Sequence, residues 1–392
     1  MSKIILPQEL YEKLELSKEE DSKVEIIDNA KNSFVIKSVS KIRKKSDIKW
    51  FLVPTVISSL LFLIISLFFL KKETLPFVGN DQSLATFILI VTNLLSFSNF
   101  IFAYIKKREN LYHEMSSNVY WRTLLTVIIS ELMISTLLLM AIFWFLNQIF
   151  YGVRFDILTS MIIVTLFSLI LNYSLIFIID NFKIEILVNM LILVALGGAI
   201  SSIVTNGNPY WWKRNLSLLG TYESEARFEF NLTLLISGAL LIALIDYIFV
   251  SMVEKFGKHW RYLILKGFLI LAALSIMGIG LVPNNEEGHV LHTQLALFIF
   301  YFMALAILGI KWLLPELGKE FIRFSYLISF LLLICYILWD YLNYFNLTAF
   351  EIFSFALGFS WLLLFINRLA EILWNGKKVY KVEQYSSNKQ EN

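Results

Sequence analysis

Ten long apolar segments constrain this chain more than any other feature of its sequence. A helix needs about 20 apolar residues to cross roughly 30 Å of hydrocarbon at 1.5 Å per residue, and ten segments reach that length. They cover residues 50–70, 84–105, 123–149, 157–179, 183–205, 231–252, 263–282, 293–313, 322–345 and 348–373. The sequence therefore predicts an all-α fold, a polytopic integral membrane protein of about ten transmembrane helices.

The composition agrees with this fold class and excludes several others. Of the 392 residues, 57% are hydrophobic and only 17% are charged, so too few polar residues remain to cover a soluble globule. The single cysteine, Cys335, lies in an apolar segment, which leaves no disulfide framework or thiolate metal site within the chain. There is no Gly-rich phosphate loop, and the basic residues form short clusters rather than a groove. We therefore expect neither a cofactor nor nucleic acid as a partner.

Lys and Arg in the short connections predict the orientation, because cytoplasmic loops carry an excess of positive charge. If both termini are cytoplasmic, the inner side receives Lys37, Lys41, Arg43, Lys44, Lys45, Lys49, Lys106, Lys107, Arg108, Lys255, Lys258, Arg261, Lys311, Lys319, Arg323, Lys377, Lys378 and Lys381. The outer side then receives Lys71, Lys72, Arg154, Lys213, Arg214 and Arg227. The bias is roughly threefold, so we expect both termini in the cytoplasm, in agreement with an even number of spans.

The segments before and after the spans are polar. Residues 1–49 begin with a Glu-rich stretch that differs from a secretory leader, and Leu10, Leu14 and Leu16 indicate a short amphipathic helix there. The following "KSVSKIRKKSDIK" is a basic arm beside the membrane. It either attracts anionic headgroups, by about 1 kcal/mol per charge, or only sets the topology. Residues 374–392 are predicted to form a polar cytoplasmic tail.

The longest predicted outer loop, residues 206–230, contains "NGNPYWWKRNLSLLGTYESEARF". Its aromatic residues are typical of the belt that settles at the headgroup level of a membrane. A basic pair beside aromatic rings is also suited to hold a phosphate or sugar headgroup. A third interpretation is a lid in which acidic residues pair with basic ones, namely Glu223, Glu225 and Glu229 with Lys213, Arg214 and Arg227. The candidate ligand-binding residues are Trp211, Trp212, Lys213, Arg214 and Asn215.

The same loop and its flanks contain a recognisable pattern. Preceded by "ALGGAISSIVT" and followed by "FEFNLTLLISGALLIAL", it reads Gly-Gly, Ser-Ser, Asn-Pro-x-Trp-Trp, Asn-x-Ser-x-Leu-Gly-Thr, Phe-Asn-x-Thr-Leu and Ser-Gly. A second element, "MGIGLVPNNEEGHVLHTQLALFIFY", lies between two later spans. Together they cover about residues 183–373 and resemble the bacterial and archaeal membrane family known as domain of unknown function 998.

The resemblance implies a domain organisation and a location, but no established reaction. It implies a six-span core of residues 183–373 in a bacterial cytoplasmic membrane, preceded here by a four-span extension of residues 50–182. The family is more distantly similar to eukaryotic Frag and DRAM-type membrane proteins, whose roles concern lipid anchors and membrane homeostasis. Proteins of the longer layout are often labelled transporter permeases, which suggests a permease subunit with further transporter subunits as partners.

Glu131 and Asp246 are among the carboxylates that fall inside predicted spans. Glu131 lies in the third span and Asp246 in the sixth, where a charge costs about 2.5–3.5 kcal/mol on insertion scales. They belong either to a polar pathway or proton-coupled site, or to hydrogen bonds that pin helices together. For the second interpretation the candidate partners are Asn172, Asn189 and Ser135.

A pair of histidines marks the outer end of the eighth span. His289 and His292 are three residues apart, so one helical face presents both imidazoles, and Asp340 is the nearest carboxylate expected at that depth. Such a set could hold zinc and activate water against a lipid ester or amide. The alternative is helix capping and interfacial hydrogen bonding, because the spacing differs from that of zinc-binding helices with a built-in Glu base.

These observations favour a non-enzymatic function. We expect the protein to handle, sense or transport a lipid-like or amphipathic molecule through an outward vestibule capped by residues 206–230. A metal-dependent hydrolase acting on lipid and a permease subunit are the alternatives. Membrane lipids are the expected partners, with a homo-oligomer left open.

Overall fold

The computed structural model of the protein describes residues 3–6, 23–29, 33–38, 47–70, 72–79, 82–108, 117–374 and 377–384. Within these residues, ten helices are long and apolar enough to cross a membrane, which confirms the predicted all-α, ten-span architecture. Helices continue past the apolar segments into polar residues. The third span, for example, begins at Ser117 and the sixth ends at Phe256, beyond the limits set by hydropathy alone.

The first four spans form what we call the N-terminal lobe. It consists of α2 (Lys49–Ile64), η1 (Ile65–Leu70), α3 (Leu84–Phe87), η2 (Ile88–Thr92), α4 (Asn93–Lys106), α6 (Ser117–Ile149) and α7 (Ile157–Asp180). Here η1 and η2 are π-helical turns that continue the neighbouring α-helices. A two-stranded sheet of β4 (Thr74–Pro76) and β5 (Arg154–Asp156) connects the spans at one end of this lobe.

The last six spans form the C-terminal lobe. It consists of α8 (Ile184–Ile192), η3 (Leu193–Gly197), α9 (Gly198–Thr205), η4 (Trp211–Lys213), η5 (Leu216–Gly220), α10 (Arg227–Phe256), α11 (Trp260–Leu281), α12 (His289–Leu313), η6 (Pro315–Leu317), α13 (Gly318–Tyr336), η7 (Ile337–Tyr341) and α14 (Leu347–Trp374). Of the short elements, η3 and η7 are π-helices, and η4, η5 and η6 are 3₁₀-helices. We call the end where α2 begins and α14 ends the terminal end, and the opposite end the loop end.

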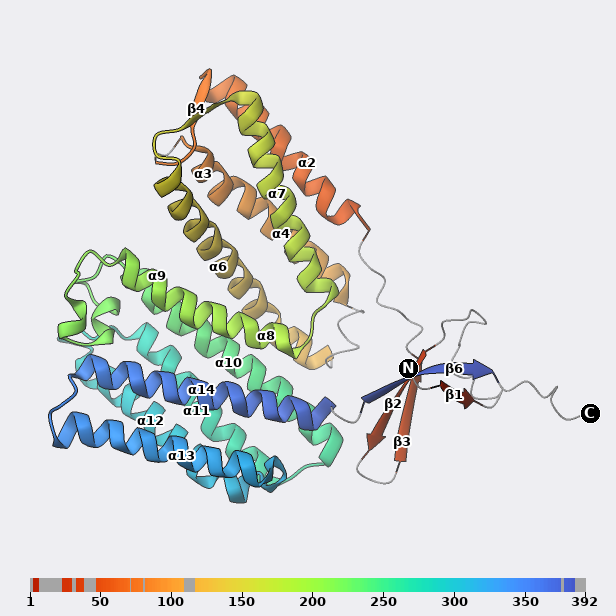
Figure 1. Cartoon of the computed structure of the whole chain (residues 1–392), viewed down its shortest axis with the longest axis vertical. Coiled ribbons are helices and arrows are strands. Elements are labelled where there is room, and N and C mark those ends of the chain that lie inside the picture. The colour runs from red at the N-terminus through yellow and green to blue at the C-terminus, as the bar shows by residue number, and fades with distance from the viewer. Residues whose placement is uncertain are drawn as a thin grey trace, which may run out of the picture.

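The two lobes pack together near the terminal end and diverge toward the loop end (Figure 1). Val127, in the first half of α6, belongs to a buried apolar cluster shared with α8 and α10. Phe143, in the second half of α6, belongs to another cluster that lies wholly within the N-terminal lobe. The lobes are therefore joined through the first half of α6, and the chain has the outline of a V.

Polar side chains join the helices inside the N-terminal lobe. The hydrogen bonds link Ser58 to Thr92 (2.9 Å), Ser59 to Thr165 (2.8 Å), Asn93 to Thr136 (2.9 Å) and Asn172 to Ser96 (2.9 Å). They connect all four spans of the lobe. Because lipid tails provide no hydrogen-bond partners, such bonds help to hold membrane helices together, at about 0.6 kcal/mol each on average.

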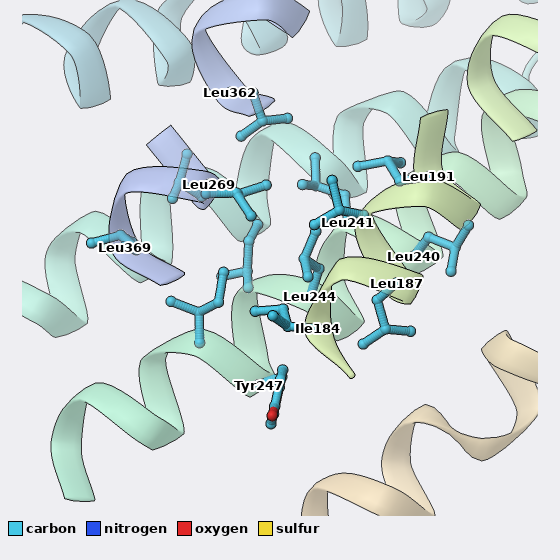
Figure 2. Close-up of a cluster of buried hydrophobic side chains, with 14 of the residues drawn as sticks. Ile184, Leu187, Leu191, Leu240, Leu241, Leu244, Tyr247, Leu269, Leu362 and Leu369 are labelled. Atoms are coloured by element: carbon cyan, nitrogen blue, oxygen red, sulfur yellow. The ribbon is translucent and has the colours of Figure 1, made fainter. Parts of the chain in front are cut away.

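Helix α10 lies at the centre of the C-terminal lobe and is the most buried of the ten described spans. Figure 2 shows Leu240, Leu241 and Leu244 of α10 gathered with Leu187 of α8 and Leu269 of α11 in one buried cluster. Helix α10 also contacts α6 and α14. It therefore joins the N-terminal lobe to the rest of the C-terminal lobe.

Both ends of the chain contribute to a four-stranded sheet beside the terminal end (Figure 1). Its strands are β1 (Lys3–Leu6), β2 (Lys23–Asn29), β3 (Ser33–Ser38) and β6 (Lys377–Gln384), in the order β1-β6-β2-β3. Strand β6 is parallel to β1 and antiparallel to β2. The sequence did not suggest these strands. The predicted amphipathic helix around Leu10, Leu14 and Leu16 lies outside the described residues.

Two glycines allow α10 and α11 to approach each other closely. A Cβ on Gly238 of α10 would lie 2.7 Å from the Ala273 carbonyl oxygen, and one on Gly280 of α11 would lie 2.6 Å from that of Asn231. We expect Gly238→Ala and Gly280→Ala each to lower the free energy of unfolding by about 1–3 kcal/mol, the usual cost of overpacking. Thermal denaturation of the purified variants in detergent is the measurement.

Gly267 provides the matched control within α11. A Cβ at this position meets no atom within 4 Å, so Gly267→Ala should instead stabilise the helix by about 1 kcal/mol through backbone entropy. If all three substitutions changed the melting temperature equally, close packing at Gly238 and Gly280 would not explain the effect.

Candidate functional site

The segment of residues 206–230, which we call the cap segment, lies across the ends of helices at the loop end. It contains the short helices η4 and η5, and η5 contacts both α10 and α14. Leu218 and Leu219 of η5 are buried. The cap segment therefore rests directly on the helix ends in this conformation.

Four hydrogen bonds join residues 212–220 of the cap segment to three helices and to the turn before α14. They join the Leu216 amide to Glu351 Oε2 (2.5 Å), Asn346 Nδ2 to the Trp212 carbonyl (3.2 Å), His292 Nε2 to Ser217 Oγ (3.0 Å) and Asn231 Nδ2 to the Gly220 carbonyl (3.0 Å). The helical partners come from α12, α14, the turn before α14, and α10. Because three of the four bonds use backbone atoms of the cap segment, its path depends on these contacts.

The aromatic and basic residues of the cap segment are close together. Lys213 Nζ lies 4.6 Å from the centre of the Tyr210 ring and 5.7 Å from that of Trp212. Tyr210, Trp212 and Lys213 are exposed, whereas Trp211 is half-buried. Among the residues that the structure describes, Lys213 has no carboxylate partner. The loop end therefore presents an unpaired cation against two aromatic faces.

Of the other basic residues of the cap segment, Arg214 has a carboxylate partner and Arg227, like Lys213, lies against an aromatic ring. Arg214 forms an exposed ion pair with Glu223 at 2.7 Å, and the Arg227 guanidinium lies 4.4 Å from the Tyr222 ring centre. Glu229 accepts hydrogen bonds from hydroxyl groups of α9 instead of binding a cation. A lid was predicted to contain several ion pairs. Among the described residues, the pair between Arg214 and Glu223 is the one that forms.

Asn215 joins η4 to η5 and is half-buried. Its Oδ1 atom is buried and accepts no hydrogen bond from the described part of the chain. A buried polar atom without a partner is uncommon in folded proteins. Within the predicted set from Trp211 to Asn215, Lys213 thus lacks a carboxylate partner and the buried Asn215 Oδ1 lacks a donor among the described residues.

The two histidines and Asp340 have separate partners. His292 is buried, and its Nδ1 and Nε2 atoms hydrogen bond to the Val282 carbonyl (2.7 Å) and to the cap segment. His289 bonds to Asn284 Oδ1 at 2.7 Å, and Asp340 accepts from a tyrosine hydroxyl. No group of three His, Cys, Asp or Glu side chains within the described ranges is arranged to hold a metal ion. In this conformation His292 Nε2 anchors the cap segment, while Nδ1 bonds to the end of α11.

Glu131 is the fifteenth of the 33 residues of α6 and is only 4% exposed. None of its three predicted partners bonds to it. Asn172 bonds within the N-terminal lobe and Ser135 to its own helix, and Asn189 is not a partner either. Across the described residues the carboxyl group has no hydrogen bond or ion pair. A buried carboxyl group without a partner is energetically unfavourable, so Glu131 does not act as a hydrogen-bonding pin here.

Asp246 is the centre of a charge cluster that joins three helices. Its carboxylate lies 2.8 Å from Lys266 Nζ of α11 and 2.9 Å from an Arg122 nitrogen of α6. Arg122 belongs to the N-terminal lobe, so this cluster connects the two lobes. Asp246 therefore joins α10 to α11 and α6 through charged partners that differ from the three expected from the sequence.

Sequence reasoning missed Lys266, Arg122 and Glu351. Lys266 and Glu351 fall inside the predicted seventh and tenth spans, and an ionisable residue within a span requires a partner. The sequence therefore already indicated that Lys266 and Glu351 each need a partner. Their actual partners lie on other helices, so hydropathy could not identify them.

We compared the chain with known proteins in three ways. Neither models of protein families, nor curated proteins, nor solved structures match it. The resemblance to the family known as domain of unknown function 998 stays a prediction. The function must therefore be inferred from the cap segment and from the charges inside the spans.

Proposed function

We propose that this chain is a non-enzymatic membrane protein that binds an anionic, lipid-like molecule at the loop end, through the cap segment. The observation that carries the proposal is Lys213, an exposed cation held against Tyr210 and Trp212 without a carboxylate partner in the described residues. Handling, sensing and transport of a lipid all begin with such binding.

The chemistry of this group suits a phosphate headgroup. An ammonium group forms charge-assisted hydrogen bonds with phosphate oxygens. Tyrosine and tryptophan rings prefer the same level of the bilayer as the headgroups, because each has an apolar body and a polar edge. A lipid phosphate therefore meets Lys213 at the depth where Tyr210 and Trp212 are most stable.

The anchoring of the cap segment supports a role as a movable cover. Besides its buried residues, among them Leu218, Leu219 and Ala226, it is held by hydrogen bonds to α9, α10, α12 and the α14 region. Two of these bonds involve the side chains of His292 and Glu351. Such contacts can exchange for water or for a ligand without unfolding a span.

We further propose that the loop end faces outward from a bacterial cytoplasmic membrane. Both ends of the described chain meet in one sheet, and positive charge is concentrated in the connections on that side. In intact cells, an impermeant maleimide should label Glu286→Cys and leave Lys319→Cys unlabelled until lysis. Both positions are exposed, and the native Cys335 is buried. Labelling of Lys319→Cys from outside would reverse the orientation.

The proposed headgroup site predicts a specific loss of lipid binding. Lys213→Gln should weaken binding of phosphatidylglycerol by about 1.5–3 kcal/mol, the contribution of a hydrogen bond to a charged group. The loss should diminish as salt concentration rises, because salt screens exposed charges. Native mass spectrometry, with phosphatidylglycerol and phosphatidylcholine titrated separately, measures the change.

The adjacent Arg214→Gln is the matched control. Its guanidinium already pairs with Glu223, so this variant should retain more phosphatidylglycerol than Lys213→Gln. Trp212→Leu keeps apolar area but removes the aromatic face, and should also weaken binding. Equal retention by wild type and all three variants would leave the cap segment as an aromatic belt.

Proton-coupled transport is a second candidate function, favoured by Glu131 alone. A carboxyl group that is buried in a span without a partner can bind and release a proton at little cost to other contacts. Its place on α6, the helix that joins the two lobes, would link protonation to the angle between them.

A further inference from the structure

A cavity lies within the N-terminal lobe, separate from the cap segment. Its volume is about 220 Å³. It lies between the loop-end parts of the first two spans, and β4 contributes to its upper wall. It is lined by Phe62, Ile65, Leu70, Leu75, Gln82, Ser83, Thr86, Phe87, Ile90 and Val91.

The cavity is formed where two neighbouring spans both widen. Ile65 and Leu70 belong to the π-helix η1, and Ile90 and Val91 belong to the π-helix η2. A π-helical turn contains an extra residue, displaces side chains from regular helical positions and is often found at functional sites. Two such turns at one level leave space that regular helices would fill.

The interior of the cavity has no free polar group. Seven of its ten lining residues are apolar. Of the polar three, Ser83 caps α3 and bonds to Thr86, and Gln82 accepts from Lys72. A polar ligand would therefore lose its hydrogen bonds with water and gain none inside. The cavity suits hydrocarbon.

The position and size of the cavity identify the source of that hydrocarbon. Ile90 is 55% exposed, and the adjacent Phe68 and Phe69 of η1 are 66% and 77% exposed. These residues belong to transmembrane spans, so the cavity opens toward lipid tails. At about 220 Å³, it is smaller than the roughly 300–1,000 Å³ of sites that enclose whole drug-sized ligands. It therefore accommodates part of a chain.

We propose that this cavity binds the upper part of one hydrocarbon chain of a phospholipid from the leaflet at the loop end. Lys72, at the rim beside Gln82, then lies at the level of the lipid phosphate. An apolar cavity left empty destabilises a protein in proportion to its volume, whereas a bound chain restores the lost contacts. The site is independent of the proposed headgroup site, because no residue of the cap segment lines it.

The test uses the full chain in nanodiscs that contain phosphatidylglycerol with a diazirine in the upper part of one acyl chain. After irradiation, peptide mass spectrometry should find the labels concentrated on residues 65–70 and 88–92. Val91→Trp fills the cavity, and labelling of these two segments should fall to the level of other lipid-facing helices. Leu94→Trp, on the same helix but outside the cavity and 50% exposed, should retain the wild-type pattern.

Ile65→Phe fills the cavity from the first span and replaces Val91→Trp if that variant does not fold. Melting temperature identifies folded variants. Labelling spread evenly over all lipid-facing helices of the wild type would overturn the proposal. Unchanged labelling in a folded cavity-filling variant, or equal loss in Leu94→Trp, would overturn it as well. Retention of phosphatidylglycerol by Lys213 variants is a separate measurement, so either proposal can be contradicted without the other.

Discussion

Asp246→Ala should lower the free energy of unfolding by about 1.5–3 kcal/mol, the contribution of a hydrogen bond to a charged group, because it leaves the half-buried Lys266 ammonium without its carboxylate. In the native protein, Lys266 Nζ lies 2.8 Å from the Asp246 carboxylate inside the bundle. Without that carboxylate, the ammonium group is left unpaired in a medium of low dielectric constant. The variant also loses the ion pair with Arg122 that joins the two lobes. Thermal and denaturant unfolding in detergent measure the effect.

Two variants test whether pairing is the cause. Combining Asp246→Leu with Lys266→Met removes the charges of this partly buried pair and should recover most of the stability, since no unpaired ammonium group remains within the span. Asp340→Ala removes an exposed carboxylate near the loop end and should change stability by about 0.5 kcal/mol or less. A melting temperature of Asp246→Ala equal to that of wild type would show that the charge cluster does not stabilise the fold.

Glu131→Met should raise the free energy of unfolding by about 1–3 kcal/mol, because it removes a buried polar group that has no partner. The two side chains have similar length and volume, so packing around α6 should be kept. Stabilisation by removal of a functional carboxylate is a known trade-off at active sites. The measurement is the same unfolding assay, and a lower melting temperature would mean that Glu131 has a stabilising partner.

Glu131→Gln separates a structural from a functional role. The amide keeps the shape of the side chain but cannot exchange a proton. If protonation drives transport, this variant should fold normally and fail to move fluorescent phosphatidylglycerol across proteoliposomes under a pH gradient. Normal transport by Glu131→Gln would exclude the proton-coupled function and leave lipid binding by the cap segment.

The spans could be predicted from the sequence because hydropathy is a local property. Each apolar segment is long enough to cross the membrane by itself, and the structure places ten spans at the predicted positions. The ends of the segments were predicted less accurately. Helix α6, for example, begins at Ser117, because residues of mixed polarity extend it beyond the apolar segment. The pairing of β6 with β1 and β2 was missed because it joins residues more than 340 positions apart, such as Lys3 and Lys381. The hairpin of β2 and β3 is local and was missed as well.

The candidate site was predictable only in part, for a similar reason. Lys213 and Tyr210 are three residues apart, so their contact follows from one helical turn. Glu351, which anchors the cap segment, lies 135 positions away from the Leu216 amide that it binds. Predicting the charge cluster around Asp246 likewise requires knowing how three helices are placed relative to one another along the membrane normal. Local pattern identified these residues as unusual, and only the packed bundle identified their partners.

The position of β6 determines when the protein can be completed during its synthesis. This strand lies between β1 and β2, yet residues 377–384 leave the ribosome after all ten spans. Strands β1 and β2 therefore lack a shared neighbour throughout membrane insertion. Only a chain whose tenth span has returned to the starting side delivers β6 to them. The sheet therefore closes last. It can close only if the chain has crossed the membrane an even number of times, because β6 must lie on the same side as β1 and β2.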